Sequence, residues 1–264
     1  MISTDTDRRL RDPPFPLRSE LGDALAEHGY RIGPEFADGW MFARSSSAPG
    51  EVAVAAASLA GPFFLSVEHP GVARELNALP AGPPAKGHRT AFALSDRDAL
   101  TAGVGAAYRL ATSLPTMPLE LFLREAAALG QTEVEAVTRR RIGQDIFREA
   151  LLAYWNGRCP LTGIAEPRLL RASHIMPWAQ CASDAERLDV HNGLLLSALW
   201  DAAFDSGLVT FANDGTPLAS PRLTADALAA LDLTRAPPLR LCPESQELMR
   251  WHRTNLFLAE ARDQ

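Results

Sequence analysis

The sequence predicts an α+β protein made of an N-terminal α+β module, a helical connector and a C-terminal segment that carries most of the residues suited to chemistry. Short apolar runs with strand character lie between residues 37 and 95, whereas helical spacing prevails over residues 116–156. Residues 158–210 then concentrate His, Asn and Asp side chains at the joints between their expected elements. We therefore expect three parts, at residues 1–115, 116–156 and 157–264.

Composition places the chain among globular proteins. The 264 residues are enough to bury a core, and the contents of 47% apolar and 22% charged residues are typical of folded chains. No apolar run approaches the roughly 20 residues of a membrane span, and the polar N-terminus lacks a signal-peptide core. Cys159, Cys181 and Cys242 form no CxxC pair, which argues against disulfides and a closed zinc site. We expect a cytoplasmic protein with no membrane partner.

Charge is unevenly distributed along the chain. The net charge of −6 by itself speaks against general nucleic-acid binding. Residues 139–178, however, hold seven arginines and three acidic residues, so this window carries +4 and the remainder −10. A basic patch on an acidic body is compatible with phosphate contacts. For the run Arg139-Arg140-Arg141 alone, a solvated helix face is an equally good interpretation.

The N-terminal module divides into short elements. Residues 1–18 are charged and proline-rich and predict an extended arm, and residues 20–27 predict a helix. The apolar runs at 63–67 and 90–94 predict strands.

Between these strands we expect a short helix within residues 70–79 and a loop over 79–87. Ser95 starts a further helix, which Pro115 and Pro118 are expected to break.

Two helices are expected in the connector. The first covers residues 119–129, and the second covers residues 132–155 and opens with a capping box of Thr132 and Glu135. Near the C-terminus, residues 244–261 predict a closing helix. Its expected apolar positions are Leu248, Trp251, Leu256 and Leu258.

Residues 158–210 predict a strand, a loop and a helix in that order. Residues 169–175 have the apolar pattern of a strand, and residues 193–204 have helical spacing. A last strand over residues 208–211 follows. A histidine on the first strand would then face a carboxylate on the helix, and an asparagine in the loop would tie the two elements together.

This segment resembles the HNH (ββα-metal) endonucleases, and most closely their restriction-type subgroup, over about residues 145–215. The resemblance rests on three motifs, which are His174-Ile175-Met176-Pro177-Trp178, Leu188-Asp189-Val190-His191-Asn192-Gly193-Leu194-Leu195-Leu196 and Phe204-Asp205-Ser206-Gly207-Leu208. It implies a ββα-metal nuclease domain within residues 157–264 and metal-dependent hydrolysis of phosphodiester bonds.

The resemblance assigns separate roles to three residues. His174 would be the general base that deprotonates the attacking water, which suits an imidazole that titrates near neutrality. Asn192 would hold the loop against the strand, so that His174 keeps one orientation. Asp201 occupies the metal-binding position, and its carboxylate suits a hard cation such as Mg²⁺ or Mn²⁺.

Ser173 departs from the family pattern, because many members have an aspartate metal ligand at this position. A serine hydroxyl would contribute weakly, through water. The ion would then depend on Asp201 and on further candidates among His191, Asp189 and Asp205. In the competing interpretation, His191 supports the site or contacts phosphate, and Asp205 caps the turn that follows it.

Three arginines beside the predicted site, Arg158, Arg168 and Arg171, are candidates for contacts with DNA phosphates. The predicted function is that of a divalent-metal-dependent HNH endonuclease that acts on DNA, with restriction or defence as its role. The N-terminal module would select the target. Cutting both strands normally requires two copies of a one-site nuclease, which favours a homodimer.

Two alternatives stay open. Given Ser173, the segment could be a degenerate HNH module that binds nucleic acid without cleaving it. The N-terminal module could instead bind a small molecule or a protein and so gate the nuclease.

Overall fold

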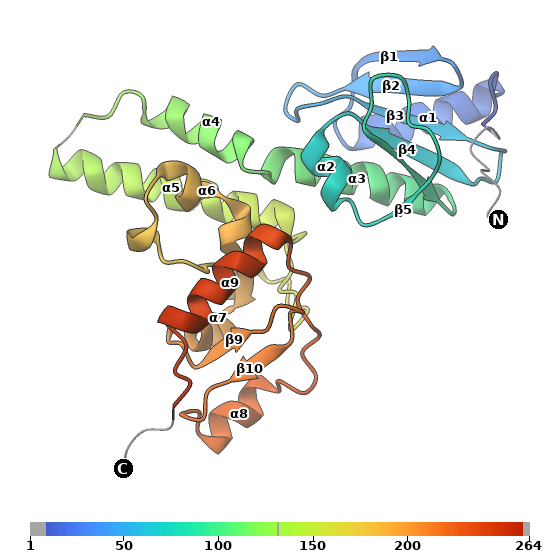
Figure 1. Ribbon diagram of the computed structural model, residues 1–264. Coiled ribbons are helices and arrows are strands. Elements are labelled where there is room, and N and C mark those ends of the chain that lie inside the picture. The colour runs from blue at the N-terminus through green and yellow to red at the C-terminus, as the bar shows by residue number, and fades with distance from the viewer. Residues whose placement is uncertain (1–8, 131, 261–264) are drawn as a thin grey trace. The chain divides into compact units, whose positions relative to one another are not determined.

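Figure 1 shows the computed structural model, which describes residues 9–130 and 132–260. The chain divides into two compact units, Met1–Thr112 and Ser113–Gln264. Both contain helices and antiparallel strands, which confirms the α+β class. None of the helices in the described ranges is long and apolar enough to cross a membrane.

The first unit is built on a six-stranded antiparallel sheet with the strand order β1-β2-β3-β4-β6-β5. Its central strands β3 and β4 are buried along their whole length, with Val54 opposite Leu65. Strands that are apolar on both faces need cover on both sides of the sheet. Helix α1 packs against β2 and β3, and Ala85 joins a second cluster with Trp40 and Phe64. The elements are α1 Phe15–Glu27, β1 Ile32–Ala37, β2 Trp40–Arg44, β3 Val52–Ala56, β4 Phe63–Val67, α2 Pro70–Glu75, β5 Leu79–Pro80, β6 Thr90–Leu94 and α3 Arg97–Ser113.

The structure confirms the strands expected at 63–67 and 90–94 and corrects the expected N-terminal arm. Residues 1–8 of that arm lie outside the described residues. Helix α1 begins at Phe15, because a proline in the first turn has no helical hydrogen bond to lose. The expected loop over 79–87 opens with the two-residue strand β5, which pairs with β6 at the sheet edge.

The second unit combines helices with two antiparallel strand pairs, β7–β8 and β9–β10. Its elements are α4 Thr116–Ala126, α5 Glu133–Tyr154, the 3-10 helix η2 Pro167–Leu169, β7 Leu170–His174, η3 Trp178–Gln180, α6 Asp184–Leu188, η4 Val190–Asn192, β8 Gly193–Ser197, α7 Ala198–Asp205, β9 Val209–Phe211, β10 Pro217–Ala219, α8 Ala225–Leu231 and α9 Pro243–Asn255.

Local signals account for how the helices of this unit begin. The capping box of α5 is confirmed, since Thr132 Oγ1 accepts from Glu135 N and Glu135 Oε2 accepts from Thr132 N. The helix expected from Ser95 ends at Ser113, before Pro115, as predicted. Pro118 takes no part in ending it, because it lies in the first turn of α4, where its missing N–H costs no hydrogen bond.

Helix α9 differs from the expected closing helix. It ends at Asn255, and its buried positions are Ser245, Met249 and His252. The expected helix over 244–261 therefore runs too far, and the expected apolar positions are not the ones that the helix buries.

The helix expected over residues 193–204 is also wrong in its first half. Gly193–Ser197 forms strand β8, which pairs with β7 so that His174 lies opposite Gly193. All five residues of β8 are buried. Periodicity cannot distinguish such a short apolar run from a buried helix, and the pairing with β7 decides in favour of the strand.

One hydrophobic core holds the second unit together. Phe122 of α4 and Phe147 and Leu151 of α5 belong to the same buried cluster as Leu195 of β8 and Phe204 of α7. Helices α4 and α5 pack against each other (Figure 1). The segment expected as a connector thus contributes directly to the core around β7 and β8.

Gly193 is a tight point of this packing, and we expect Gly193→Ala to destabilise the second unit. An added Cβ would lie 2.6 Å from Phe147 Cζ and 2.8 Å from Leu151 Cδ1. Overpacking of this kind costs about 1–3 kcal/mol. Urea unfolding followed by tryptophan fluorescence measures the loss.

Gly22→Ala in α1 is the matched control, because its added Cβ would meet only Met41 Sδ at 3.6 Å. Helix propensity predicts a gain of up to about 1 kcal/mol for this variant. A Gly193→Ala protein as stable as the wild type would contradict the packing argument.

Candidate active site

Strands β7 and β8 and helix α7 bring the three motif residues into one ββα unit. His174 is the last residue of β7, Asn192 directly precedes β8, and Asp201 lies in the first turn of α7. Ser173 connects strand and helix, because its buried hydroxyl donates a hydrogen bond to Asp201 Oδ1. The carboxylate is thus oriented by the residue that stands where the family pattern has an aspartate.

The His174 imidazole is held between aromatic rings. It stacks on Phe147 of α5 with 3.8 Å between ring centroids, and it lies nearly perpendicular to the Trp178 ring, with 5.6 Å between centroids. Its Nε2 is 2.9 Å from the Arg187 carbonyl oxygen. Because a carbonyl only accepts, Nε2 carries the proton of the neutral ring and Nδ1 keeps its lone pair.

This environment favours the neutral ring. Burial lowers the pKa of His174 below its usual 6.5, although the hydrogen bond to the Arg187 carbonyl opposes the shift in part. A neutral imidazole with an available lone pair can accept a proton, which is the requirement for a general base.

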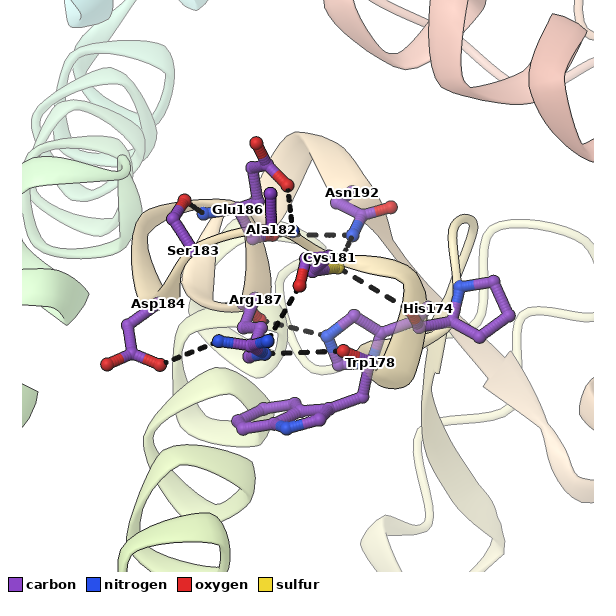
Figure 2. Close-up of polar contacts among 10 residues, drawn as sticks. His174, Trp178, Cys181, Ala182, Ser183, Asp184, Glu186, Arg187 and Asn192 are labelled. Carbon is purple, nitrogen blue, oxygen red and sulfur yellow. Dashed lines mark hydrogen bonds and ion pairs between the residues drawn. The ribbon is translucent and has the colours of Figure 1, made fainter.

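Asn192 joins the two ends of the loop that follows His174, and Figure 2 shows its contacts with Glu186 and Cys181. Its Oδ1 accepts from Met176 N at 2.8 Å, and its Nδ2 lies 3.1 Å from the Met176 carbonyl and 3.3 Å from the Glu186 carbonyl. Nδ2 is also 3.4 Å from Cys181 Sγ. The amide therefore fixes the path of the chain on both sides of the loop.

A pocket of about 330 Å³ opens beside the imidazole. It is lined by Ala172, Ser173, His174, Pro177, Trp178, Asp205, His252 and Leu256. Asp205 comes from α7, one turn after Asp201. Burial and then the charge of Asp201 raise the pKa of Asp205 to about 6. The pocket thus combines a base with a carboxyl group that titrates above its usual range.

His191 and Asp189 lie elsewhere. His191 is buried, its Nδ1 is 3.0 Å from Asp189 Oδ1, and its ring meets the edge of Tyr154. Its carbonyl accepts from Ser245 Oγ of α9 at 2.8 Å. Neither His191 nor Asp189 lines the pocket beside His174. Asp201 does not line it either, but its carboxylate accepts the hydrogen bond of Ser173, which does. The structure thus connects Asp201 to the pocket through Ser173.

The three candidate phosphate-binding arginines are exposed, with Arg171 in β7, Arg168 in η2 directly before it and Arg158 in the segment between α5 and η2. Arg158 Nη1 donates to the Gly163 carbonyl, and Arg171 Nη1 donates to the carbonyls of Arg168 and Leu170. The guanidinium groups of Arg158 and Arg171 therefore use part of their donors on the backbone. Arg168 is also exposed.

Sequence reasoning missed several residues that shape this site. Arg187 supplies the carbonyl that orients His174, and Phe147 supplies the ring beneath it. His252 lines the pocket, next to Asp205, which the sequence had already offered as a candidate metal ligand. One signal was available for His252, because it follows Ser245 and Met249 at spacings of four and three, the pattern of a buried helix face.

Comparison with known families agrees with this geometry. Residues 159–212 match the family model described as HNH endonuclease. This stretch is an HNH-family segment. It contains His174, Asn192 and Asp201, together with β7, β8 and α7. No curated protein matched the chain, and the restriction-type subgroup stays a prediction.

HNH nucleases generally use a divalent cation, and the donor atoms at the HNH site suit one. Asp201 and Asp205 are neighbouring carboxylates, and the charge of one raises the pKa of the other. A cation would relieve this repulsion. Within the described ranges no three or more His, Cys, Asp or Glu side chains form a metal cluster. The protein would therefore supply few ligands, as is usual for Mg²⁺ held also by water and phosphate.

His252 makes the stability of the second unit depend on pH. Its ring is fully buried and stacks on Phe204, with 4.0 Å between centroids, and Nδ1 is 3.0 Å from Thr210 Oγ1. Burial lowers the pKa of His252 to about 4, more than the Phe204 backbone raises it. The stability from the neutral ring is complete above pH 6.5 and is lost as the pH falls from 6.5 to about 4.

We therefore expect the free energy of unfolding to drop by up to about 3 kcal/mol over this range because of His252. His252→Phe keeps a ring against Phe204 and removes the titration, so its unfolding free energy should fall less on acidification. Urea unfolding at a series of pH values measures both proteins. The same pH dependence in both would contradict this role of His252.

Proposed function

We propose that the chain is a divalent-metal-dependent endonuclease that hydrolyses phosphodiester bonds of DNA, with Mg²⁺ or Mn²⁺ as its ion. The observation that carries the proposal is the His174 ring, whose Nε2 is bound to a carbonyl and whose Nδ1 lone pair is available, in the ββα unit that also presents Asp201. The family match over residues 159–212 supports the same reaction.

In this mechanism His174 removes a proton from a water molecule through Nδ1. The water oxygen forms a bond to phosphorus, and the bond between phosphorus and the leaving sugar oxygen breaks. Asp201 would hold the ion through the oxygen that Ser173 leaves available, and Asp205 would add a second carboxylate. A bound divalent ion stabilises negative charge on the phosphate and on the leaving oxygen.

The remaining parts of the proposal concern the substrate. Arg158, Arg168 and Arg171 would contact phosphates beside the site, where they add affinity without reading sequence. The first unit would select the target, in a restriction or defence role. Cutting both strands would require two copies of the chain.

The bond between Ser173 and Asp201 also favours a second candidate function. The serine hydroxyl occupies one oxygen of the Asp201 carboxylate, and Ser173 offers the metal no charged ligand of its own. A module that binds DNA without cleaving it would need no stronger metal site than this one.

The proposal predicts that His174→Ala cleaves DNA about 10²–10⁴-fold more slowly, because the base is removed. Supercoiled plasmid is incubated with Mg²⁺ or Mn²⁺, and nicked and linear products are quantified. EDTA should abolish cleavage by the wild type. Fluorescence anisotropy with labelled DNA should show that His174→Ala still binds, which separates catalysis from affinity.

The second candidate predicts a different result in the same assay. Binding without nicking in either metal, on plain, methylated and hydroxymethylated DNA, would favour the module that does not cleave. Cleavage by His174→Ala at the wild-type rate would remove His174 as the base.

The lowered pKa of His174 sets the pH dependence of cleavage. The neutral ring is the active form. Titration of His174 should therefore leave the cleavage rate unchanged from pH 7 to 8 and should lower it on acidification below about 6.5. Asp205, whose pKa burial and the charge of Asp201 raise to about 6, also titrates in the acid range. Profiles of rate against pH at two Mg²⁺ concentrations separate the two groups. If protonation of Asp205 limits the rate by weakening metal binding, more Mg²⁺ shifts the fall in rate to lower pH. If protonation of His174 limits the rate, the fall stays in place. A midpoint above 6.5 would contradict the assignment.

A further inference from the structure

We infer that Arg187 is a positioning residue, whose guanidinium group fixes the loop that orients the His174 imidazole. The inference rests on the proposed function for its catalytic consequence, whereas the orientation itself can be observed without cleavage. Nothing in the HNH spacing of His174, Asn192 and Asp201 points to this side chain.

The Arg187 carbonyl, which accepts the hydrogen bond from His174 Nε2, belongs to a short element. Arg187 lies in α6, a helix of five residues between η3 and η4. A helix this short is marginal by itself and depends on contacts around it. The position of the Arg187 carbonyl must therefore be fixed by other bonds.

The guanidinium of the same residue provides these bonds (Figure 2). Nε is 3.2 Å from the Trp178 carbonyl, and Nη2 is 2.6 Å from the Cys181 carbonyl. Nη1 is 3.0 Å from Asp184 Oδ1. Three different nitrogens thus reach the start of the loop, its middle and the first turn of α6.

The bond to Trp178 connects this network to the imidazole by a second route. The guanidinium carbon of Arg187 lies 5.9 Å from the centroid of the Trp178 ring, and that ring makes a T-shaped contact with His174. One side chain therefore fixes both the carbonyl that binds Nε2 and the indole that borders the imidazole.

The planar group is required for this geometry. An arginine presents donors on three nitrogens in a fixed fork, whereas the single nitrogen of a lysine cannot reach three separate acceptors in the same way. Asn192 ties Met176 to Glu186 independently. Loss of the guanidinium should therefore release the loop locally and leave the fold of the unit intact.

Arg187→Met keeps the aliphatic stem and removes every donor, which makes it the main variant. Arg253→Met is the matched control, because Arg253 also bridges a carbonyl and a side-chain oxygen in this unit, those of Phe211 and Asn213. Arg187→Lys and Asp184→Asn weaken the network in part. The Asp184 side chain is 37% exposed, so its amide replacement should fold normally.

The first measurement is NMR of the imidazole at fixed pH, without DNA or metal. In the wild type the His174 Nε2 proton should exchange slowly with water, and its carbon-bound protons should show the ring-current shift of the Phe147 stack. His174→Ala assigns these signals. In Arg187→Met the slow exchange and the ring-current shift should be lost, in Asp184→Asn they should weaken, and in Arg253→Met they should persist.

The second measurement is steady-state cleavage. Misplacement of a reacting group by about 1 Å can cost about 10²-fold, so kcat of Arg187→Met should fall by about 10- to 100-fold with KM little changed. Arg187→Lys should recover part of the loss.

The outcomes separate the two hypotheses. Wild-type imidazole signals in both Arg187→Met and Asp184→Asn would overturn the inference, whatever the activity. If Arg187→Met loses these signals and the wild type does not cleave DNA, the positioning role is sustained and the proposed function is defeated. Weaker DNA binding alone, seen as a raised KM with unchanged imidazole signals, would assign Arg187 to DNA contact instead.

Discussion

The hydrogen bond from His174 Nε2 to the Arg187 carbonyl determines which nitrogen of the ring is a base, and much of the second unit supports that bond. An imidazole has two nitrogens, and a partner that can only accept places the proton of the neutral ring on the nitrogen that it contacts. The carbonyl at 2.9 Å meets this condition. Phe147 and Trp178 then restrict the plane of the ring. Orientation and protonation state are thus set by the same surroundings.

Packing and chemistry share residues in this unit. Gly193 has no side chain, which leaves room for Phe147 and Leu151 to approach the end of β7. Gly143 has the same effect for the loop, since a Cβ there would lie 2.6 Å from Trp178 Cη2. Helix α5 can therefore contact both the imidazole and the indole that borders it. The helix is part of the core and, in the same contacts, a wall of the site.

How far the sequence predicts the structure depends on the range of the interactions involved. The start of α5 is predicted correctly, because the two bonds between Thr132 and Glu135 are local. Strand β8 is mistaken for helix, because its pairing with β7 lies across a long loop and its buried residues show no alternation. Arg187 also escapes prediction, because its role consists of contacts that spacing along the chain does not reveal.

Ser173 changes the electrostatics of the site as well as its ligand set. An aspartate at this position would add a third carboxylate beside Asp201 and Asp205, and like charges at short range repel. The serine hydroxyl donates a hydrogen bond to Asp201 instead, which stabilises that carboxylate without a cation. On the proposed mechanism the site therefore holds its shape before metal binds, and its affinity for the ion is lower than it would be with an aspartate at position 173. Substrate phosphate would then supply much of the coordination, so that metal and DNA bind together.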